Sequence, residues 1–233
     1  MHRFIGKFPI SDNEFWVGDE ELVHQVRDVL KLRVGEKIVL VGGEGKEAIC
    51  EITGFDGDYL GIKVLENKEN QNDPKVSVEL YLSILKNENF DLAVQKAVEV
   101  GVSKIIPIIA DHTVKTGLKA ERIKKIMKEA SEQSGRAVVP ELIEPMDLKD
   151  AIKLAGENDV NIFFDVSGEK LDLKKSLKIK KIGVFIGPEG GWSEREISAA
   201  KFAKLKLCSF GKLVYRAETA STIAVYEAVK SLG

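Results

Sequence analysis

The sequence contains few of the residues that build disulfide frameworks, metal centres or catalytic triads. Among its 233 residues there are only two cysteines and three histidines. Cys50 and Cys208 lie far apart without metal-ligand spacing, so neither a disulfide framework nor a zinc site is indicated, and both are expected to be small core residues. His2, His24 and His112 are scattered, and no Ser-His-Asp order accompanies them. We therefore expect no metal site, and surface or packing roles for the histidines.

Long apolar runs are also missing. No stretch approaches the roughly 18 to 20 apolar residues that a membrane-spanning helix needs. The N-terminal segment MHRFIGKFPISDNEF lacks the apolar core of a signal peptide. Charged residues make up 31% of the chain and hydrophobic residues 44%, as in many globular proteins. We expect a cytoplasmic protein that does not associate with a membrane.

Acidic and basic residues are distributed unevenly along the chain. Residues 1–73 carry 9 Lys and Arg against 15 Asp and Glu, whereas residues 74–233 carry 26 against 22. Between these parts the polar stretch LENKENQNDPK, residues 65–75, contains an Asp-Pro turn signal and is interpreted as a linker. We therefore expect two domains, at residues 1–70 and 74–233.

The two parts also differ in their hydrophobic patterns. In the first part a predicted helix, DEELVHQVRDVLK, precedes three short β-branched or alternating runs, EKIVLV, KEAICEITGF and YLGIKVLE, which favour a small antiparallel barrel or sheet. In the second part, strand patterns such as VSVELYLSIL, KIIPII and KIGVFIG alternate with amphipathic helix patterns. Such alternation predicts an α/β fold whose parallel sheet is covered on both faces.

One strand of the second part ends in an unusual loop, IGPEGGWSEREI, which starts at Ile186. Ser193 and Glu196 fit a capping box at a helix start, which leaves GPEGG unexplained. A tight turn is the plain interpretation, because glycine tolerates positive φ. A phosphate site is disfavoured, because Glu189 adds a negative charge and Pro188 lacks an amide donor. A ligand that is neutral or cationic at the contact fits better.

A second loop of the same kind follows. FGKLVYRAETAS, Phe210 to Ser221, also leaves a strand through a glycine, passes an apolar LVY and enters a helix. In parallel sheets, ligands bind at the carboxyl ends of the strands. Two such loops at neighbouring strand ends could enclose one small molecule.

Together the two loops resemble the signature of the RsmE family, small-subunit ribosomal RNA uridine methyltransferases of the SPOUT superfamily. The segments HRF, QKAVEVGVSKIIPI and EASEQSGRAVVPEL match the family pattern in order. The resemblance implies a C-terminal SPOUT trefoil-knot domain with a mostly parallel sheet and a small N-terminal PUA-like β-barrel that helps to bind RNA. It also implies a homodimer that uses S-adenosylmethionine to methylate nitrogen 3 of a specific uridine in the decoding region of 16S ribosomal RNA.

The resemblance also assigns roles to residues of both loops. The predicted cofactor contacts are Ile186, Gly187, Pro188, Glu189, Gly190, Gly191, Leu213, Val214 and Tyr215. A carboxylate is tolerable there, because S-adenosylmethionine carries a sulfonium cation. Arg216 and Glu218 are the catalytic candidates, since a fixed guanidinium can stabilise a developing uracil anion without serving as a base. The structural alternative is an ion pair between Arg216 and a carboxylate such as Glu218.

Positive charge suggests where RNA binds. Residues 113–136 hold seven Lys and Arg against three Glu, which could meet phosphates, although such a run is usually a solvated helix face. Arg3 and Arg136 belong to the matched HRF and EQSGR segments and are the predicted RNA contacts. The partner would be 16S rRNA or the small ribosomal subunit.

Two other functions remain open from the sequence. The chain could be a nonenzymatic RNA-binding adaptor whose α/β domain only dimerises. It could also be a transferase that uses the same glycine loops for another nucleotide.

Overall fold

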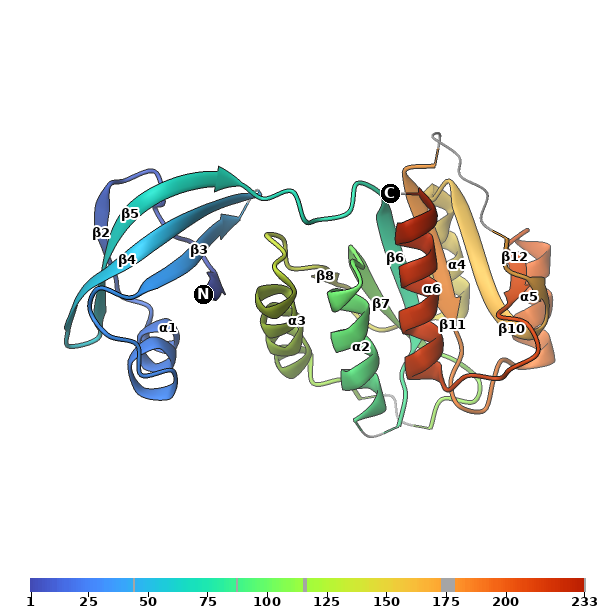
Figure 1. Ribbon diagram of the computed structural model, residues 1–233. Coiled ribbons are helices and arrows are strands. Elements are labelled where there is room, and N and C mark those ends of the chain that lie inside the picture. Colours follow the sequence, from blue (N-terminus) through green and yellow to red (C-terminus); the bar gives the residue numbers. More distant parts are fainter. Residues whose placement is uncertain (44, 87, 115–116, 173–178, 233) are drawn as a thin grey trace. The chain divides into compact units, whose positions relative to one another are not determined.

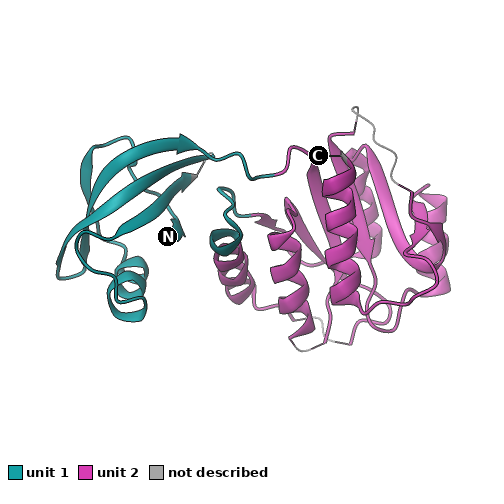
Figure 2. Ribbon diagram, in the orientation of Figure 1, with its two compact units in different colours: residues 1–73, 131–139 teal, residues 74–130, 140–233 magenta. Residues whose placement is uncertain are grey.

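The computed structural model describes residues 1–43, 45–86, 88–114, 117–172 and 179–232. The chain divides into two compact units. Unit 1 comprises Met1–Asp73 and Ser131–Val139, and unit 2 comprises Pro74–Ala130 and Pro140–Gly233 (Figure 2). Residues 131–139 therefore belong to unit 1 although they lie far beyond Asp73 in the sequence.

Unit 1 is built on a mixed five-stranded sheet in the order β1-β3-β4-β5-β2. The strands are β1 His2–Ile5, β2 Glu14–Val17, β3 Lys37–Gly43, β4 Lys46–Asp56 and β5 Tyr59–Glu69. Strand β1 pairs with β3 in parallel, and the other pairings are antiparallel. The expected linker is partly wrong, because residues 66–69 pair with 46–49 as the end of β5.

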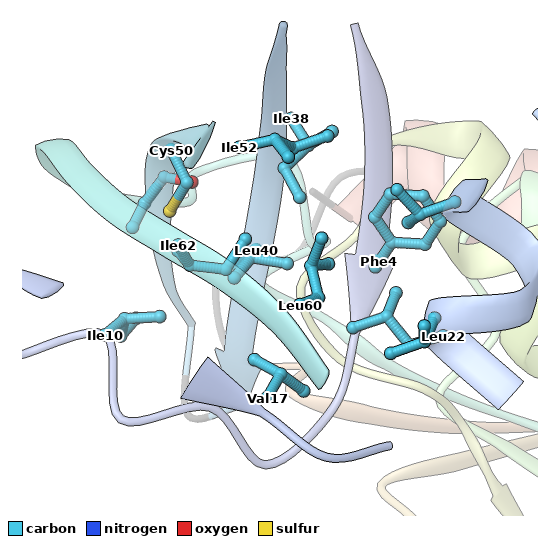
Figure 3. Close-up of a cluster of buried hydrophobic side chains, with 13 residues drawn as sticks. Phe4, Ile10, Val17, Leu22, Ile38, Leu40, Cys50, Ile52, Leu60 and Ile62 are labelled. Atoms are coloured by element: carbon cyan, nitrogen blue, oxygen red, sulfur yellow. The ribbon is translucent and has the colours of Figure 1, made fainter. Parts of the chain in front are cut away.

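A short helical segment closes the core of unit 1. Helix α1, Glu20–His24, is capped by Asp19, whose side chain accepts a hydrogen bond from the Leu22 amide at 3.0 Å, and it continues as a π-helical turn, Gln25–Val29. The core contains the side chains that point inward from the strands, such as Leu40 in β3 and Cys50 and Ile52 in β4 (Figure 3). Cys50 is a buried core residue, and burial raises the pKa of its thiol to about 11.

Hydrogen bonds attach residues 131–139 to the rest of unit 1. Helix α3, Ala120–Ser134, ends at Gly135, which adopts a φ of +82°. The Gly135 carbonyl accepts hydrogen bonds from the side-chain amides of Asn70 and Asn72 at 3.0 and 2.9 Å. Asp73 binds both the Arg136 guanidinium, at 2.8 Å, and the Ala137 amide, at 2.9 Å. The polar stretch before Pro74 thus serves as an attachment point for this segment.

Unit 2 is built on a parallel sheet in the order β12-β10-β11-β6-β7-β8, and β9 also pairs with β7. Its strands are β6 Ser77–Ser83, β7 Lys104–Ile109, β8 Glu141–Leu142, β9 Met146–Asp147, β10 Val160–Lys170, β11 Lys181–Ile186 and β12 Lys206–Ser209. The pairings among the described strands of this sheet are all parallel. The expected α/β fold class is confirmed.

Helices cover both faces of this sheet (Figure 1). Helices α2 Asn89–Glu99 and α6 Ala217–Leu232 pack together on one face. The other face carries α4 Leu148–Leu154 and α5 Glu194–Phe202. Helix α4 continues as a 3-10 turn, Ala155–Glu157. On the α4 and α5 side, the rings of Tyr81 and Phe185 stack with centroids 4.2 Å apart within the buried core. This arrangement leaves the strand ends free to carry a site.

Candidate cofactor and catalytic site

A cavity of about 450 Å³ lies at the carboxyl ends of neighbouring strands β12, β10 and β11. The two loops singled out in the sequence, residues 187–193 and 210–216, form much of its lining. All of the predicted cofactor residues line it except Gly190, and both Arg216 and Glu218 line it as well. The geometry thus brings both loops to one cavity.

Loop 187–193 is held tightly to the sheet. The Trp192 indole Nε1 donates a hydrogen bond of 3.0 Å to the Phe164 carbonyl, and its ring lies so close that a Cβ on Gly187 would be 3.0 Å from it. Gly191 adopts a φ of +70°, and its amide donates to the Pro188 carbonyl at 2.9 Å. These two glycines are needed for close packing and for a left-handed turn.

The capping box that begins helix α5 is present as predicted. The Ser193 hydroxyl accepts a hydrogen bond from the Glu196 amide at 3.2 Å, and the Glu196 carboxylate accepts one from the Ser193 amide at 2.8 Å. The same carboxylate also accepts from the Asp111 amide at 2.9 Å. The helix start is therefore fastened to the end of β7 as well as to its own backbone.

Glu189 links the glycine loop to the end of β6. Its carboxylate accepts hydrogen bonds from the Lys86 amide at 2.9 Å and from the Asn89 side-chain amide at 3.5 Å. Burial is the largest single influence and raises the pKa of the Glu189 carboxyl, but hydrogen bonds from the Lys86 amide, its own amide and the Asn89 side chain together outweigh it, so the pKa falls below its ordinary value. The carboxylate is therefore ionised at neutral pH and positioned by the protein.

Gly190 faces away from the cavity, toward the turn that follows β7. A Cβ on Gly190 would lie 3.1 Å from the Cβ of His112. The His112 Nδ1 lies 3.2 Å from the Gly190 carbonyl oxygen and 3.0 Å from that of Gly191. The predicted cofactor contact of Gly190 stays a prediction, and its described neighbour is a histidine.

Loop 210–216 is held mainly by aromatic stacking. The Phe210 ring stacks on Phe164, with centroids 4.2 Å apart, and Tyr215 packs edge-on against Phe210 at 5.5 Å. Leu213 and Val214, the expected apolar walls, line the cavity but are 70% and 79% exposed. This side of the cavity is therefore open to solvent.

Arg216 and Glu218 stand at the start of helix α6. The Arg216 side chain is exposed, and within the described residues it forms no ion pair, so the predicted alternative of a pair with Glu218 is not observed. The Glu218 Oε2 atom is buried and has no hydrogen-bond partner among the described residues. The cavity lining thus includes a guanidinium without an ion pair and a buried carboxylate oxygen without a hydrogen-bond partner among the described residues.

Several cavity residues escaped the sequence interpretation. Asn89 at the start of α2, Asp165 and Val166 in β10, and Phe210 all line the cavity. The register of β10 shifts between Phe164 and Glu169, which displaces Asp165 and Val166 from regular pairing with β12. The rule that ligands bind at strand ends could have indicated Asp165, because it follows the apolar run NIFF.

The comparisons with known proteins decide the family. Residues 71–228 match the model of the RNA methyltransferase domain. The chain belongs to the RsmE family of RNA methyltransferases. It is 30% identical over 231 residues to the ribosomal RNA small subunit methyltransferase E of Rickettsia conorii, covering 96% of this chain and 92% of the relative.

Other members of the RsmE family are similar over most of the chain. The enzyme of the same name from Bacillus subtilis is 26% identical and covers 88% of this chain and 86% of its own length. The crystal structure of the Neisseria gonorrhoeae enzyme, bound to S-adenosylmethionine, superposes with a TM-score of 0.86 at 27% identity, covering 100% of this chain and 98% of that one. The mixed N-terminal sheet and the parallel C-terminal sheet are therefore the family fold.

The two arginines predicted to contact RNA lie in unit 1 and form internal ion pairs. Arg3 binds the Glu47 carboxylate, and the two side chains are only 16% and 14% exposed. Arg136 is 6% exposed and binds Asp73. Their RNA role stays a prediction, and in this family member an RNA phosphate would have to compete with these carboxylates.

No group of three or more His, Cys, Asp or Glu side chains that could hold a metal ion occurs among the described residues. None of the described helices combines the length and the apolar character required to cross a membrane.

Proposed function

We propose that this protein transfers a methyl group from S-adenosylmethionine to nitrogen 3 of a uridine in the decoding region of 16S ribosomal RNA. The observation that carries the proposal is the cavity at the strand ends, lined by both loops, with Arg216 free of ion pairs among the described residues. The relatives are ribosomal RNA small subunit methyltransferases E, which supports the RNA substrate. The crystal structure of the Neisseria relative supports the cofactor.

The cavity residues fit S-adenosylmethionine. The buried and unpartnered Glu218 Oε2 requires a donor, and the hydroxyl and amino groups of this cofactor are donors. Gly187 and Gly191 bring backbone groups to the cavity wall, and Leu213 and Val214 offer apolar surface. When bound, S-adenosylmethionine would supply a methyl group activated by a positively charged sulfur. The ionised Glu189 carboxylate is compatible with that positive charge.

Arg216 is proposed to stabilise the acceptor base. The uracil imide is a weak acid, about as weak as a tyrosine phenol with a pKa near 10. As nitrogen 3 loses its proton and accepts the methyl carbon, negative charge on the flanking oxygens needs a partner. A guanidinium is charged at any working pH and presents several N–H donors in one plane, which suits two such oxygens. The proton itself would leave to another group, because Arg216 is a poor base.

The wider assembly is part of the same proposal. Unit 1 would help to bind RNA as a PUA-like barrel, and the enzyme would act as a homodimer in the cytoplasm. In helix α6, Val225 and Ala228 are covered within unit 2, whereas Tyr226 is 48% exposed. Like Leu213 and Val214, Tyr226 is an exposed large apolar side chain that a second subunit could cover. Light scattering at micromolar concentration should show a dimer, and a monomer that still methylates RNA would exclude it.

Binding and product analysis test the proposed reaction. Calorimetry should show saturable binding of S-adenosylmethionine and of its demethylated product, and no comparable binding of ATP. Small subunits that lack the modification, incubated with protein and cofactor, should gain one methyl group on a uracil ring nitrogen, located by mass spectrometry of RNA fragments. RNA binding without cofactor binding would favour an adaptor. Preferential binding of ATP would favour a different transferase.

A further inference from the structure

The turn that follows β7 contacts loop 187–193 at several points. Residues 110–113 form a closed turn, because the Thr113 amide donates to the Ala110 carbonyl at 3.0 Å and the Thr113 hydroxyl accepts from the Ala110 amide at 2.9 Å. Asp111 then binds the Ser193 hydroxyl at 2.5 Å and the Arg195 guanidinium. A compact turn is therefore attached to the end of the glycine loop.

His112 reaches the middle of the same loop. Its Nδ1 lies 3.2 and 3.0 Å from the carbonyl oxygens of Gly190 and Gly191. Carbonyl oxygens only accept hydrogen bonds, so the proton must reside on Nδ1, which acts as the donor to both. One of the two carbonyls belongs to Gly191, whose backbone is left-handed, and the other belongs to the residue before it. His112 thus stabilises the one turn that sets the direction of the loop.

Gly190 makes this contact possible. A Cβ at position 190 would lie 3.1 Å from the Cβ of His112, closer than side chains normally pack. The cavity does not include Gly190, although it includes Gly187, Pro188, Glu189 and Gly191. The lack of a side chain at position 190 therefore leaves room for His112. On the cavity side of the loop, nothing among the described residues requires a glycine at this position.

We infer that His112 is a positioning residue that holds loop 187–191 in the shape that receives the cofactor, and that Gly190 is required because it admits His112. This inference rests on the proposed function, since it takes the cavity to be a cofactor site. It assigns no contact between His112 and the cofactor or the RNA.

Hydrogen exchange of the protein without cofactor tests the contact by itself. Replacing His112 by Ala should speed exchange of the Gly191 amide, which donates to Pro188, by about threefold to tenfold, the loss expected for one hydrogen bond. The Gly35 amide of unit 1, which donates to the Ile52 carbonyl at 2.8 Å, should be unchanged and serves as an internal control. His112→Asn keeps a donor near the Nδ1 position and should preserve protection, whereas His112→Asp places an acceptor there and should lose it. Equal exchange in all variants would overturn the inference, whatever the cofactor proves to be.

A double-mutant cycle tests the role of Gly190. Gly190→Ala should weaken S-adenosylmethionine binding by about threefold to tenfold, as for loss of one hydrogen bond. In a His112→Gly background, which removes the crowding Cβ, the same change should add little further loss. A loss that is equal in both backgrounds would show that Gly190 faces the cofactor and would overturn this part of the inference. His24→Ala, which removes an exposed histidine bonded to Asp28 in unit 1, is the matched control.

Discussion

The two loops of the cavity are built in opposite ways. Loop 187–193 is hydrogen-bonded to three other segments: it donates to the Phe164 carbonyl and accepts from the Lys86 amide and from His112. Loop 210–216 depends on the stacking of Phe210 and exposes two large apolar side chains. The side of the cavity formed by loop 187–193 is therefore fixed before a ligand binds, whereas the side formed by loop 210–216 exposes apolar surface to solvent.

This difference suggests a division of labour. A preformed wall lowers the ordering cost of binding and can define the cofactor's position. An exposed apolar wall gains stability when a ligand or partner covers it, because burial of apolar surface is favourable. Variants in loop 187–193 should therefore already change the free protein, whereas variants in loop 210–216 should change binding and chemistry and leave the free protein nearly unchanged.

The largest effect is expected at Arg216. Arg216→Ala should leave the melting temperature nearly unchanged, because the side chain is exposed, and should lower the single-turnover methylation rate by about 100-fold to 1000-fold. Arg216→Lys should recover only part of the rate, because one ammonium cannot span two oxygens as a guanidinium does. Rates measured at saturating cofactor and RNA separate this effect from binding. Arg27→Ala, an exposed arginine of unit 1, is the control. A folded Arg216→Ala enzyme with a normal rate would remove Arg216 from the mechanism.

The next effect is expected in the fixed loop. Trp192→Phe removes the hydrogen bond to the Phe164 carbonyl inside the core and should lower the free energy of unfolding by about 1 to 2 kcal/mol. Trp16→Phe changes an indole that is 56% exposed in unit 1 and should stay within about 0.5 kcal/mol. Urea unfolding of both variants measures the contrast. Equal losses would mean that loop 187–193 is no better anchored than a surface side chain.

The sequence predicted the location of the site because both loops follow a local rule. The pattern KIGVFIG and the apolar run before Gly211 predicted strands that end beside the two loops, the observed strands end at Ile186 and Ser209, and parallel strands bring such ends to one edge of a sheet. The capping box at Ser193 was equally local and is confirmed. Patterns that depend on a few neighbouring residues could therefore be interpreted without a structure.

Features that depend on distant partners could not be predicted in this way. The contact between Gly190 and His112 joins residues 78 positions apart, and the pair between Arg136 and Asp73 joins residues 63 apart. Composition suggested a linker at residues 65–75, but pairing with β4 extends β5 through Glu69. In each case a residue's role depends on the distant residue that it contacts, and the periodicity of the sequence does not indicate which residue that is.

The exposed wall should respond differently from the fixed loop. Leu213→Ser should change the free energy of unfolding by less than about 0.5 kcal/mol, because the side chain is 70% exposed in the free protein. It should nevertheless weaken S-adenosylmethionine binding by about threefold to tenfold, the effect of losing part of one buried apolar side chain. Calorimetry beside thermal unfolding tests both expectations. Phe202→Ser, 92% exposed at the end of α5, should change neither quantity. A large loss of stability in Leu213→Ser would contradict the open wall.

The smallest effect concerns Glu189 and depends on pH. The folded-state pKa of Glu189 lies below its ordinary value, so the unfolded chain binds the proton more tightly and an ionised Glu189 stabilises the fold. That stabilisation is fully present above the ordinary glutamate value near pH 4.5 and is lost as the pH falls through the lower folded-state value. Glu189→Gln keeps an acceptor for the Lys86 amide but removes the charge. Because the side chain is exposed, we expect a loss of less than about 1 kcal/mol at pH 7.

Urea unfolding at a series of pH values tests the sign. The difference between wild type and Glu189→Gln should shrink steadily below pH 4.5 and vanish once the carboxyl is protonated in both states. Glu88→Gln is the matched control, because Glu88 precedes α2 without a side-chain capping hydrogen bond, so its effect at pH 7 should be smaller. A Glu189→Gln difference that stays constant from pH 7 into acid would show that the charge does not hold the glycine loop to β6. The contrast between the two loops would then rest on Trp192 and His112 alone.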